Sequence, residues 1–126
     1  VIEAKKENGK VKPVKITTVV DVGICVNPDT VRAQTEGSIV MGLTATFKSG
    51  IRLENGAVAQ SNFHDYNMLV FEECPPCETY ILQNEEKPEG AGESGLANVA
   101  PSLCNAIFDL TGVRVRKLPL DLGAIG

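Results

Sequence analysis

The clearest chemical feature of this sequence is a glycine-rich run, GAGESG, at residues 90–95, which contains the carboxylate of Glu93. Its three glycines allow backbone conformations closed to other residues and let a ligand approach the peptide groups. The run is predicted to lead into a helix, where exposed amides favour anionic groups. It lacks the Lys-Ser/Thr pair of a Walker loop, and no strand precedes it as in a dinucleotide fold. Taken alone, such a run is more often an ordinary loop than a ligand site.

Gln34 is the second candidate, because it lies in a predicted helix beside the small residues Gly37 and Ser38. A glycine inside a helix costs about 1 kcal/mol relative to alanine. Such a residue often marks the close approach of another backbone or of a ligand. Without a second observation, a glutamine in this position is usually hydrogen-bonded locally or faces solvent.

The cysteines offer a third kind of chemistry. Only Cys74 and Cys77 have C-x-x-C spacing, whereas a structural zinc site needs a second pair at matching spacing. A redox dithiol is expected at the start of a helix, but this pair is predicted to lead from a loop into a strand. We therefore interpret the two thiols as incidental and keep a zinc or dithiol protein as an alternative. His64 is the single histidine, so chemistry that needs two imidazoles is excluded within this sequence.

Composition limits the class of protein. The 126 residues carry a net charge of −4, with 43% hydrophobic and 22% charged residues, which fits one domain with its own core. The acidic balance argues against a nucleic-acid partner, and no apolar stretch is long enough to span a membrane. The lysines near the N-terminus are interrupted by Glu3 and Glu7, and we interpret this segment as a solvated edge.

The first half of the chain predicts a strand, a helix and a hairpin. Residues 11–22 are rich in β-branched side chains, which predicts a strand. A helix is expected over residues 29–47, because Asn27 is a good N-cap and Pro28 suits the first helical position. Asn55 and Gly56 between short apolar segments predict a hairpin. The expected apolar stripe of the helix consists of Val31, Thr35, Ile39, Leu43 and Phe47.

The second half predicts an ordered loop packed on the domain at residues 60–76, a short strand at 78–83 and a helix over 96–110. Asn98 is the expected N-cap of that helix, and Gly112 is a good stop signal. Residues 113–116 alternate and predict a half-exposed final strand. The expected fold is therefore α+β, with two long helices packed on a mixed sheet of short strands in the order β-α-β-β-β-α-β.

Several blocks, in order over residues 11–120, resemble the C-terminal part of the large, molybdenum-binding subunit of the xanthine oxidase family of hydroxylases. Such an ordered set is far more specific than any one block. Within that family, QSNFHDY at 60–66 and GAGESGLA at 90–97 look most like the β subunits of isoquinoline 1-oxidoreductase and related aldehyde dehydrogenases. The other blocks are DVG (21–23), NPD (27–29), QTEG (34–37), AP (100–101), NAI (105–107), TGVRVR (111–116) and LP (118–119).

The resemblance implies roles for the candidate residues. Glu93 matches the catalytic base, which accepts a proton from the attacking hydroxide as an electron-poor carbon is hydroxylated with oxygen from water. Gln34 matches a glutamine that touches the cofactor, and Ala91 and Gly92 would give it close backbone contact. The implied cofactor is molybdopterin, as the cytosine dinucleotide, with 2Fe-2S clusters on a partner subunit or domain. No metal ligand is expected in this chain.

The resemblance also implies partners and an incomplete site. The expected partners are the remainder of the molybdenum subunit, a small iron–sulfur subunit and a small-molecule N-heterocycle or aldehyde. A chain of 126 residues is too small to enclose a pterin dinucleotide, so residues 1–126 are expected to form one domain, a C-terminal fragment of the catalytic subunit. Many relatives have Pro after the glutamate, where this chain has Ser94. The alternative is a non-catalytic α+β interaction module. The catalytic interpretation predicts that Glu93 and Gln34 border one concavity.

Overall fold

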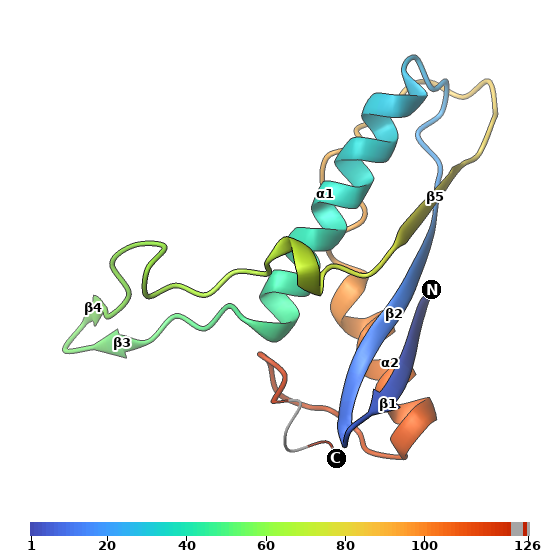
Figure 1. The fold of residues 1–126 in the computed structure, drawn as a ribbon. Coiled ribbons are helices and arrows are strands. Elements are labelled where there is room, and N and C mark those ends of the chain that lie inside the picture. Colours follow the sequence, from blue (N-terminus) through green and yellow to red (C-terminus); the bar gives the residue numbers. More distant parts are fainter. Residues whose placement is uncertain (122–124, 126) are drawn as a thin grey trace.

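A computed structural model describes residues 1–121 and 125 of the chain. It has the predicted α+β architecture, in which two helices cover one face of a three-stranded sheet (Figure 1). The sheet contains β1 (Ile2–Glu7), β2 (Lys10–Val20) and β5 (Cys77–Ile81), in the order β1-β2-β5. The helices are α1 (Pro28–Phe47) and α2 (Val99–Thr111), which contact each other and the sheet.

The N-terminal segment is more ordered than the predicted solvated edge. It forms β1, which pairs antiparallel with β2 through a turn at Asn8 and Gly9, both with positive φ. Its lysines are exposed, as expected of an edge strand, but Ile2 is buried in the core. β5 pairs with β2 in parallel, from Ile16 opposite Cys77 onward. The mixed sheet thus joins the two halves of the chain.

Helix α1 begins and packs as its sequence predicts. The Asn27 side chain accepts a hydrogen bond from the Thr30 amide at 3.1 Å, and Pro28 occupies the first turn. Thr35 and Leu43 from the predicted stripe are fully buried. Buried threonine is tolerated because each hydroxyl donates to a carbonyl one turn earlier, as Thr35 does to Val31 at 2.9 Å.

Replacing Asn27 by alanine is expected to destabilise the chain by about 1 kcal/mol, because the Thr30 amide loses the Asn27 acceptor at the N-terminal end of the helix. The measurement is the urea midpoint of the variant. Asn67→Ala, at an exposed position outside the helices, is the matched control. Equal midpoints for Asn27→Ala and the wild type would show that this cap contributes nothing.

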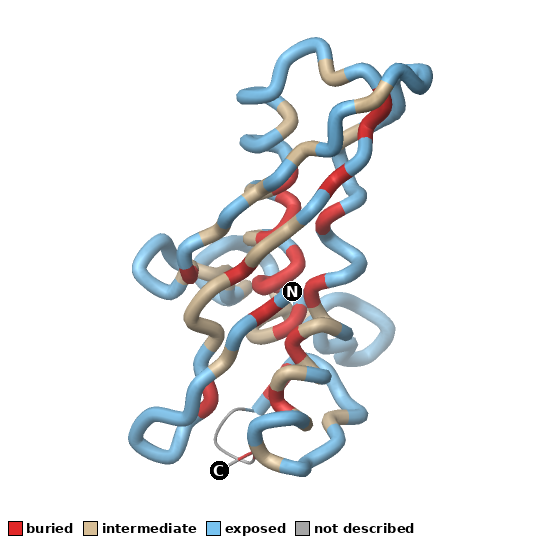
Figure 2. Tube along the Cα trace, turned by 90° about the vertical axis from the view of Figure 1, so that its right-hand side faces the viewer, coloured by how far each residue is buried: buried red, intermediate tan, exposed pale blue. Residues whose placement is uncertain are grey.

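The core lies between the sheet and the two helices, and buried segments follow the inner faces of all three (Figure 2). Because each helix buries only one stripe, the outer faces remain exposed. The buried apolar cluster consists of Ile2, Val11, Ile16, Ile39, Leu43, Val99, Leu103, Ile107, Leu120 and Ile125.

Residues 50–70 form an arm that extends away from the sheet and helices (Figure 1). The predicted hairpin is present as β3 (Leu53–Glu54) and β4 (Ala57–Val58), turning at Asn55 and Gly56. The prediction that residues 60–76 pack on the domain holds only toward the end of this segment. There the Leu69 amide donates to Thr44 at 3.3 Å, just before the short helix η1 (Phe71–Glu73). Phe63, in the arm itself, is 78% exposed.

Two predicted details at the C-terminal end differ from the structure. Residues 113–116 are not a strand, because Arg114 lies over the Phe108 ring of α2 at 3.4 Å instead of pairing with the sheet. The observed element order is therefore β-β-α-β-β-β-α. Asn98 stands at the start of α2 but does not cap it, since its side-chain amide donates back to the Ser94 carbonyl at 3.5 Å.

In the described part of the chain, residues 1–121 and 125, neither helix has the length and apolar character needed to cross a membrane.

Candidate functional site

The glycine-rich loop lies directly against α1. Gly95 is buried, and a Cβ atom added there would overlap the Ser38 hydroxyl and stand 3.3 Å from the Thr35 carbonyl oxygen. Gly42, one turn further along α1, makes the second close approach. A Cβ atom on Gly42 would lie 2.7 Å from Val99 Cγ2 and 2.9 Å from the Leu96 carbonyl oxygen. Absent side chains at both positions therefore let the loop and the start of α2 touch the helix.

The loop is also ordered internally. The Leu96 amide donates to the Glu93 carbonyl at 3.1 Å, and the Val99 amide donates to the Leu96 carbonyl at 3.2 Å. The first of these turns contains both Glu93 and Gly95, which are separated only by Ser94. The Glu93 side chain is exposed, and within residues 1–121 and 125 its carboxylate has no ion pair or hydrogen bond. Its oxygens are thus left open to a ligand or to solvent.

Gln34 is exposed on α1, four residues before Ser38 and therefore on the same side of the helix. Gly37 and Gly92 have open space where a side chain would stand. Ala91 is half-buried. Helix α1 carries Gln34, and the loop carries Ala91, Gly92 and Glu93. The two segments are in contact through the neighbouring residues Ser38 and Gly95. The exposed residues on this face of α1 are small or uncharged, namely Ala33, Gln34, Gly37 and Met41.

A hollow of about 450 Å³ lies beside the loop, between β2 and the start of α2. Ser94 and Gly95 line it, but Gln34 and Glu93 do not. The expected common concavity is therefore not this hollow. Gln34 and Glu93 are both exposed on the surface of the chain.

The Cys77 thiol has the properties of an inert side chain. Cys74 and Cys77 both lie against the Pro75 carbonyl, at 3.6 and 3.4 Å. Burial, then the neighbouring Cys74 and Glu36, raise the pKa of Cys77 to about 11. A metal ligand or redox nucleophile needs the opposite shift. Across residues 1–121 and 125, no three His, Cys, Asp or Glu side chains are grouped to hold a metal.

Alkylation gives a direct test of the Cys77 thiol. With its pKa raised from 9.0 to about 11, Cys77 should react with iodoacetamide at pH 8 about 100-fold more slowly than a short cysteine peptide. The rate should rise about tenfold per pH unit until the pH approaches 11, because only the thiolate reacts. Mass spectrometry of the Cys77 peptide measures it, and the same chain in urea is the control. Reaction at the speed of the peptide would contradict this assignment.

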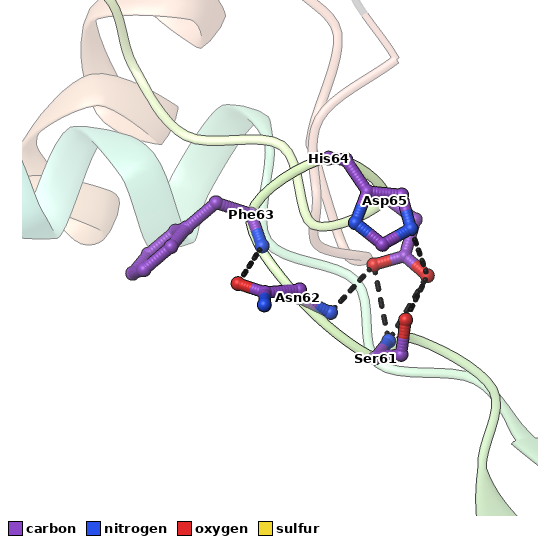
Figure 3. Close-up of polar contacts among 5 residues, drawn as sticks. All are labelled: Ser61, Asn62, Phe63, His64 and Asp65. Atoms are coloured by element: carbon purple, nitrogen blue, oxygen red, sulfur yellow. Dashed lines mark hydrogen bonds and ion pairs between the residues drawn. The ribbon is translucent and has the colours of Figure 1, made fainter.

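The arm contains a second polar cluster, at residues 61–65 (Figure 3). The Asp65 carboxylate accepts hydrogen bonds from the Asn62 and Ser61 amides, all at 3.0 Å, and these bonds lower the pKa of Asp65. The Ser61 hydroxyl also donates to Asp65, at 3.1 Å, while His64 Nε2 is 3.7 Å from the same carboxylate. The histidine is not placed between serine and carboxylate, so the cluster has a structural function in the loop and is not a hydrolytic triad.

Comparison with known proteins places these observations in a family. A family model described as a molybdopterin cofactor-binding domain matches residues 1–75. The chain is 34% identical over 106 residues, 84% of its length, to isoquinoline 1-oxidoreductase subunit beta of Brevundimonas diminuta. It is 35% identical over 119 residues, 94% of its length, to a membrane-bound aldehyde dehydrogenase of Gluconacetobacter polyoxogenes whose name specifies pyrroloquinoline quinone.

These relatives are much longer proteins. The matched regions are 14% of the first relative and 15% of the second, so the chain spans about one seventh of their length. The fold is also found in a solved structure, quinoline 2-oxidoreductase from Pseudomonas putida 86. That likeness has a TM-score of 0.71 and 19% identity, and it covers 86% of this chain and 15% of the other.

Proposed function

This chain belongs to the molybdopterin cofactor-binding domain family, as its ordered sequence blocks predicted, and from this premise we propose that it contributes part of a molybdenum hydroxylase active site. Residues 1–126 would form one domain, a C-terminal fragment of the molybdopterin-binding catalytic subunit. The parent enzyme would be an oxidoreductase of the isoquinoline 1-oxidoreductase or aldehyde dehydrogenase type. The names of two relatives with more than 30% identity support this class.

We infer that Glu93 is the catalytic base and that Gln34, Ala91 and Gly92 contact the cofactor. One observation carries this assignment: the loop that bears Glu93 is packed on α1 at Gly95, one helical turn from Gln34. Two segments separated by more than fifty residues of sequence are thereby in contact. The Glu93 side chain is exposed.

The residues on this surface fit a flat, weakly polar heterocycle. Space is open beside Gly37 and Gly92, and Gln34 offers an amide donor and an acceptor without charge. Gln34 and the peptide groups of Ala91 and Gly92 would hold the pterin. When bound, the molybdenum–pterin group supplies the two-electron redox chemistry of hydroxylation. Glu93 accepts the proton released as oxygen from water attacks the substrate carbon.

The rest of the site is proposed to come from other parts of the enzyme. The outward-facing position of Gln34 and Glu93 supports a cofactor covered by the remainder of the molybdenum subunit. We propose the cytosine dinucleotide form of molybdopterin, 2Fe-2S clusters on a partner subunit or domain, and an N-heterocycle or aldehyde as substrate. The family match favours molybdopterin over the quinone cofactor in the name of one relative.

A non-catalytic α+β interaction module is less favoured because the matched relatives are named as a dehydrogenase and an oxidoreductase subunit. Such a module is expected to pack the Glu93 loop against protein with no hollow beside Gln34, and the packing of Gly95 on α1 is compatible with both interpretations. The experiment that decides is Glu93→Gln in the full-length subunit, with turnover and molybdenum content measured together. Loss of turnover at full molybdenum content would support the catalytic assignment.

A further inference from the structure

We propose that the contact between Gly95 and Ser38 is a positioning lock, which sets where the Glu93 carboxylate stands relative to the Gln34 face of α1. This proposal rests on the proposed function for its catalytic consequence, but not for the lock itself. Gly95 and Ser38 act through Glu93 and are positioning residues, with no contact to substrate assigned to them.

The first step is steric. Gly95 is buried against α1, and any Cβ atom at this position would overlap the Ser38 hydroxyl. Ser38 cannot yield without cost, because its hydroxyl is buried and donates to the Thr35 carbonyl at 2.7 Å. The same added Cβ would stand only 3.3 Å from that carbonyl oxygen. The fit therefore excludes a Cβ atom at position 95 as long as Ser38 keeps its hydroxyl in this place.

The second step connects the lock to Glu93. The Leu96 amide donates to the Glu93 carbonyl at 3.1 Å, closing a turn that contains Gly95. A displacement of Gly95 therefore moves Glu93 with it. The contact at Gly42, where the Leu96 carbonyl and Val99 approach α1, holds the other end of the turn. With both ends in contact with one helix, the loop has little freedom to slide.

The third step concerns the direction of the loop. Val99 and the Leu96 carbonyl approach α1 at Gly42, and Gly95 approaches it at Ser38, one turn closer to the N-terminus of the helix. The contacts on α1 therefore run toward its N-terminus as the loop is followed backward from Val99 to Gly95. Gln34 lies one helical turn before Ser38, at the end of α1 toward which these contacts run. A shift of about 1 Å at a reacting group can cost about 10²-fold in rate, so a lock at this place has catalytic consequences.

The test uses the full-length subunit with its cofactor and compares four variants with the wild type. Gly95→Ala introduces the overlap, and Ser38→Ala/Gly95→Ala removes the hydroxyl that the new methyl group meets. Gly50→Ala is the matched control, because among residues 1–121 and 125 a Cβ atom there meets only Pro119, at 3.8 Å. Glu93→Gln tests the proposed function separately. Molybdenum content, kcat, KM and hydrogen–deuterium exchange over residues 90–98 are measured for each.

Gly95→Ala should lower kcat about 10- to 100-fold with little change in KM, and should speed amide exchange over residues 90–98. The double variant should recover kcat to within about 3-fold of wild type and restore slow exchange. If Gly95→Ala alone fails to fold, the double variant should still fold. Gly50→Ala should behave as wild type.

Wild-type exchange and kcat in Gly95→Ala would overturn the lock, as would a double variant no better than Gly95→Ala. If Glu93→Gln keeps its turnover, the proposed function fails, and the exchange measurements alone then decide whether the lock exists. If Glu93→Gln is inactive while Gly95→Ala is normal, the lock fails and the proposed function stands.

Discussion

Glu93→Gln in the full-length subunit is expected to lower kcat by about 10²- to 10⁴-fold, the contribution usual for a positioned general base. Glutamine keeps the size of the side chain and its hydrogen-bonding oxygen but cannot accept the proton. The Glu93 side chain is exposed and has no hydrogen bond or ion pair in residues 1–121 and 125, so the substitution breaks no contact within the described structure. Folding and molybdenum content should therefore be unchanged.

The control for this experiment is Glu85→Gln, which removes another exposed carboxylate from the loop region before the glycine-rich run. Steady-state kinetics, molybdenum content and circular dichroism are measured on both variants. Normal turnover in Glu85→Gln, with the loss confined to Glu93→Gln, separates the base from a general effect of charge. Turnover close to wild type in Glu93→Gln would leave this chain with a structural function only.

Features fixed by local sequence were predictable. Helix α1 was predicted to within one residue at its start, because Asn27 and Pro28 are strong start signals and the apolar stripe has helical spacing. The Asn55-Gly56 hairpin was predictable because these residues adopt the positive φ values that a tight turn needs. Both follow from interactions between residues close in sequence.

Features decided by individual side-chain contacts were not predictable in the same way. The alternation at residues 113–116 is that of a strand, but Arg114 stacks on Phe108, and the described structure gives the segment no strand partner. The Asn98 side chain was expected to cap α2 and instead donates to Ser94 in the preceding loop. In each case a specific side-chain contact competes successfully with the preference that the sequence pattern indicates.

The candidate site shows the same division. Composition and spacing identified Glu93 and Gln34 only as weak candidates, and the family resemblance gave them roles. No pattern in the sequence pairs Gly95 with Ser38, because their contact joins a loop to a helix far away in the chain. An isolated glycine indicates that some close approach exists, but the partner is known only from the fold.

Leu43→Ala is expected to destabilise the 126-residue chain by about 2–5 kcal/mol, the usual cost of truncating a fully buried leucine. Leu43 has 0% exposure and lies in the core cluster on α1, the helix that carries Gln34, Ser38 and Gly42. The cavity left by alanine weakens the packing that holds this helix against the sheet. Leu53→Ala, at a position 73% exposed in the arm, should change stability by less than about 0.5 kcal/mol. Urea unfolding measures both variants, and equal midpoints would mean that α1 is not anchored through this core.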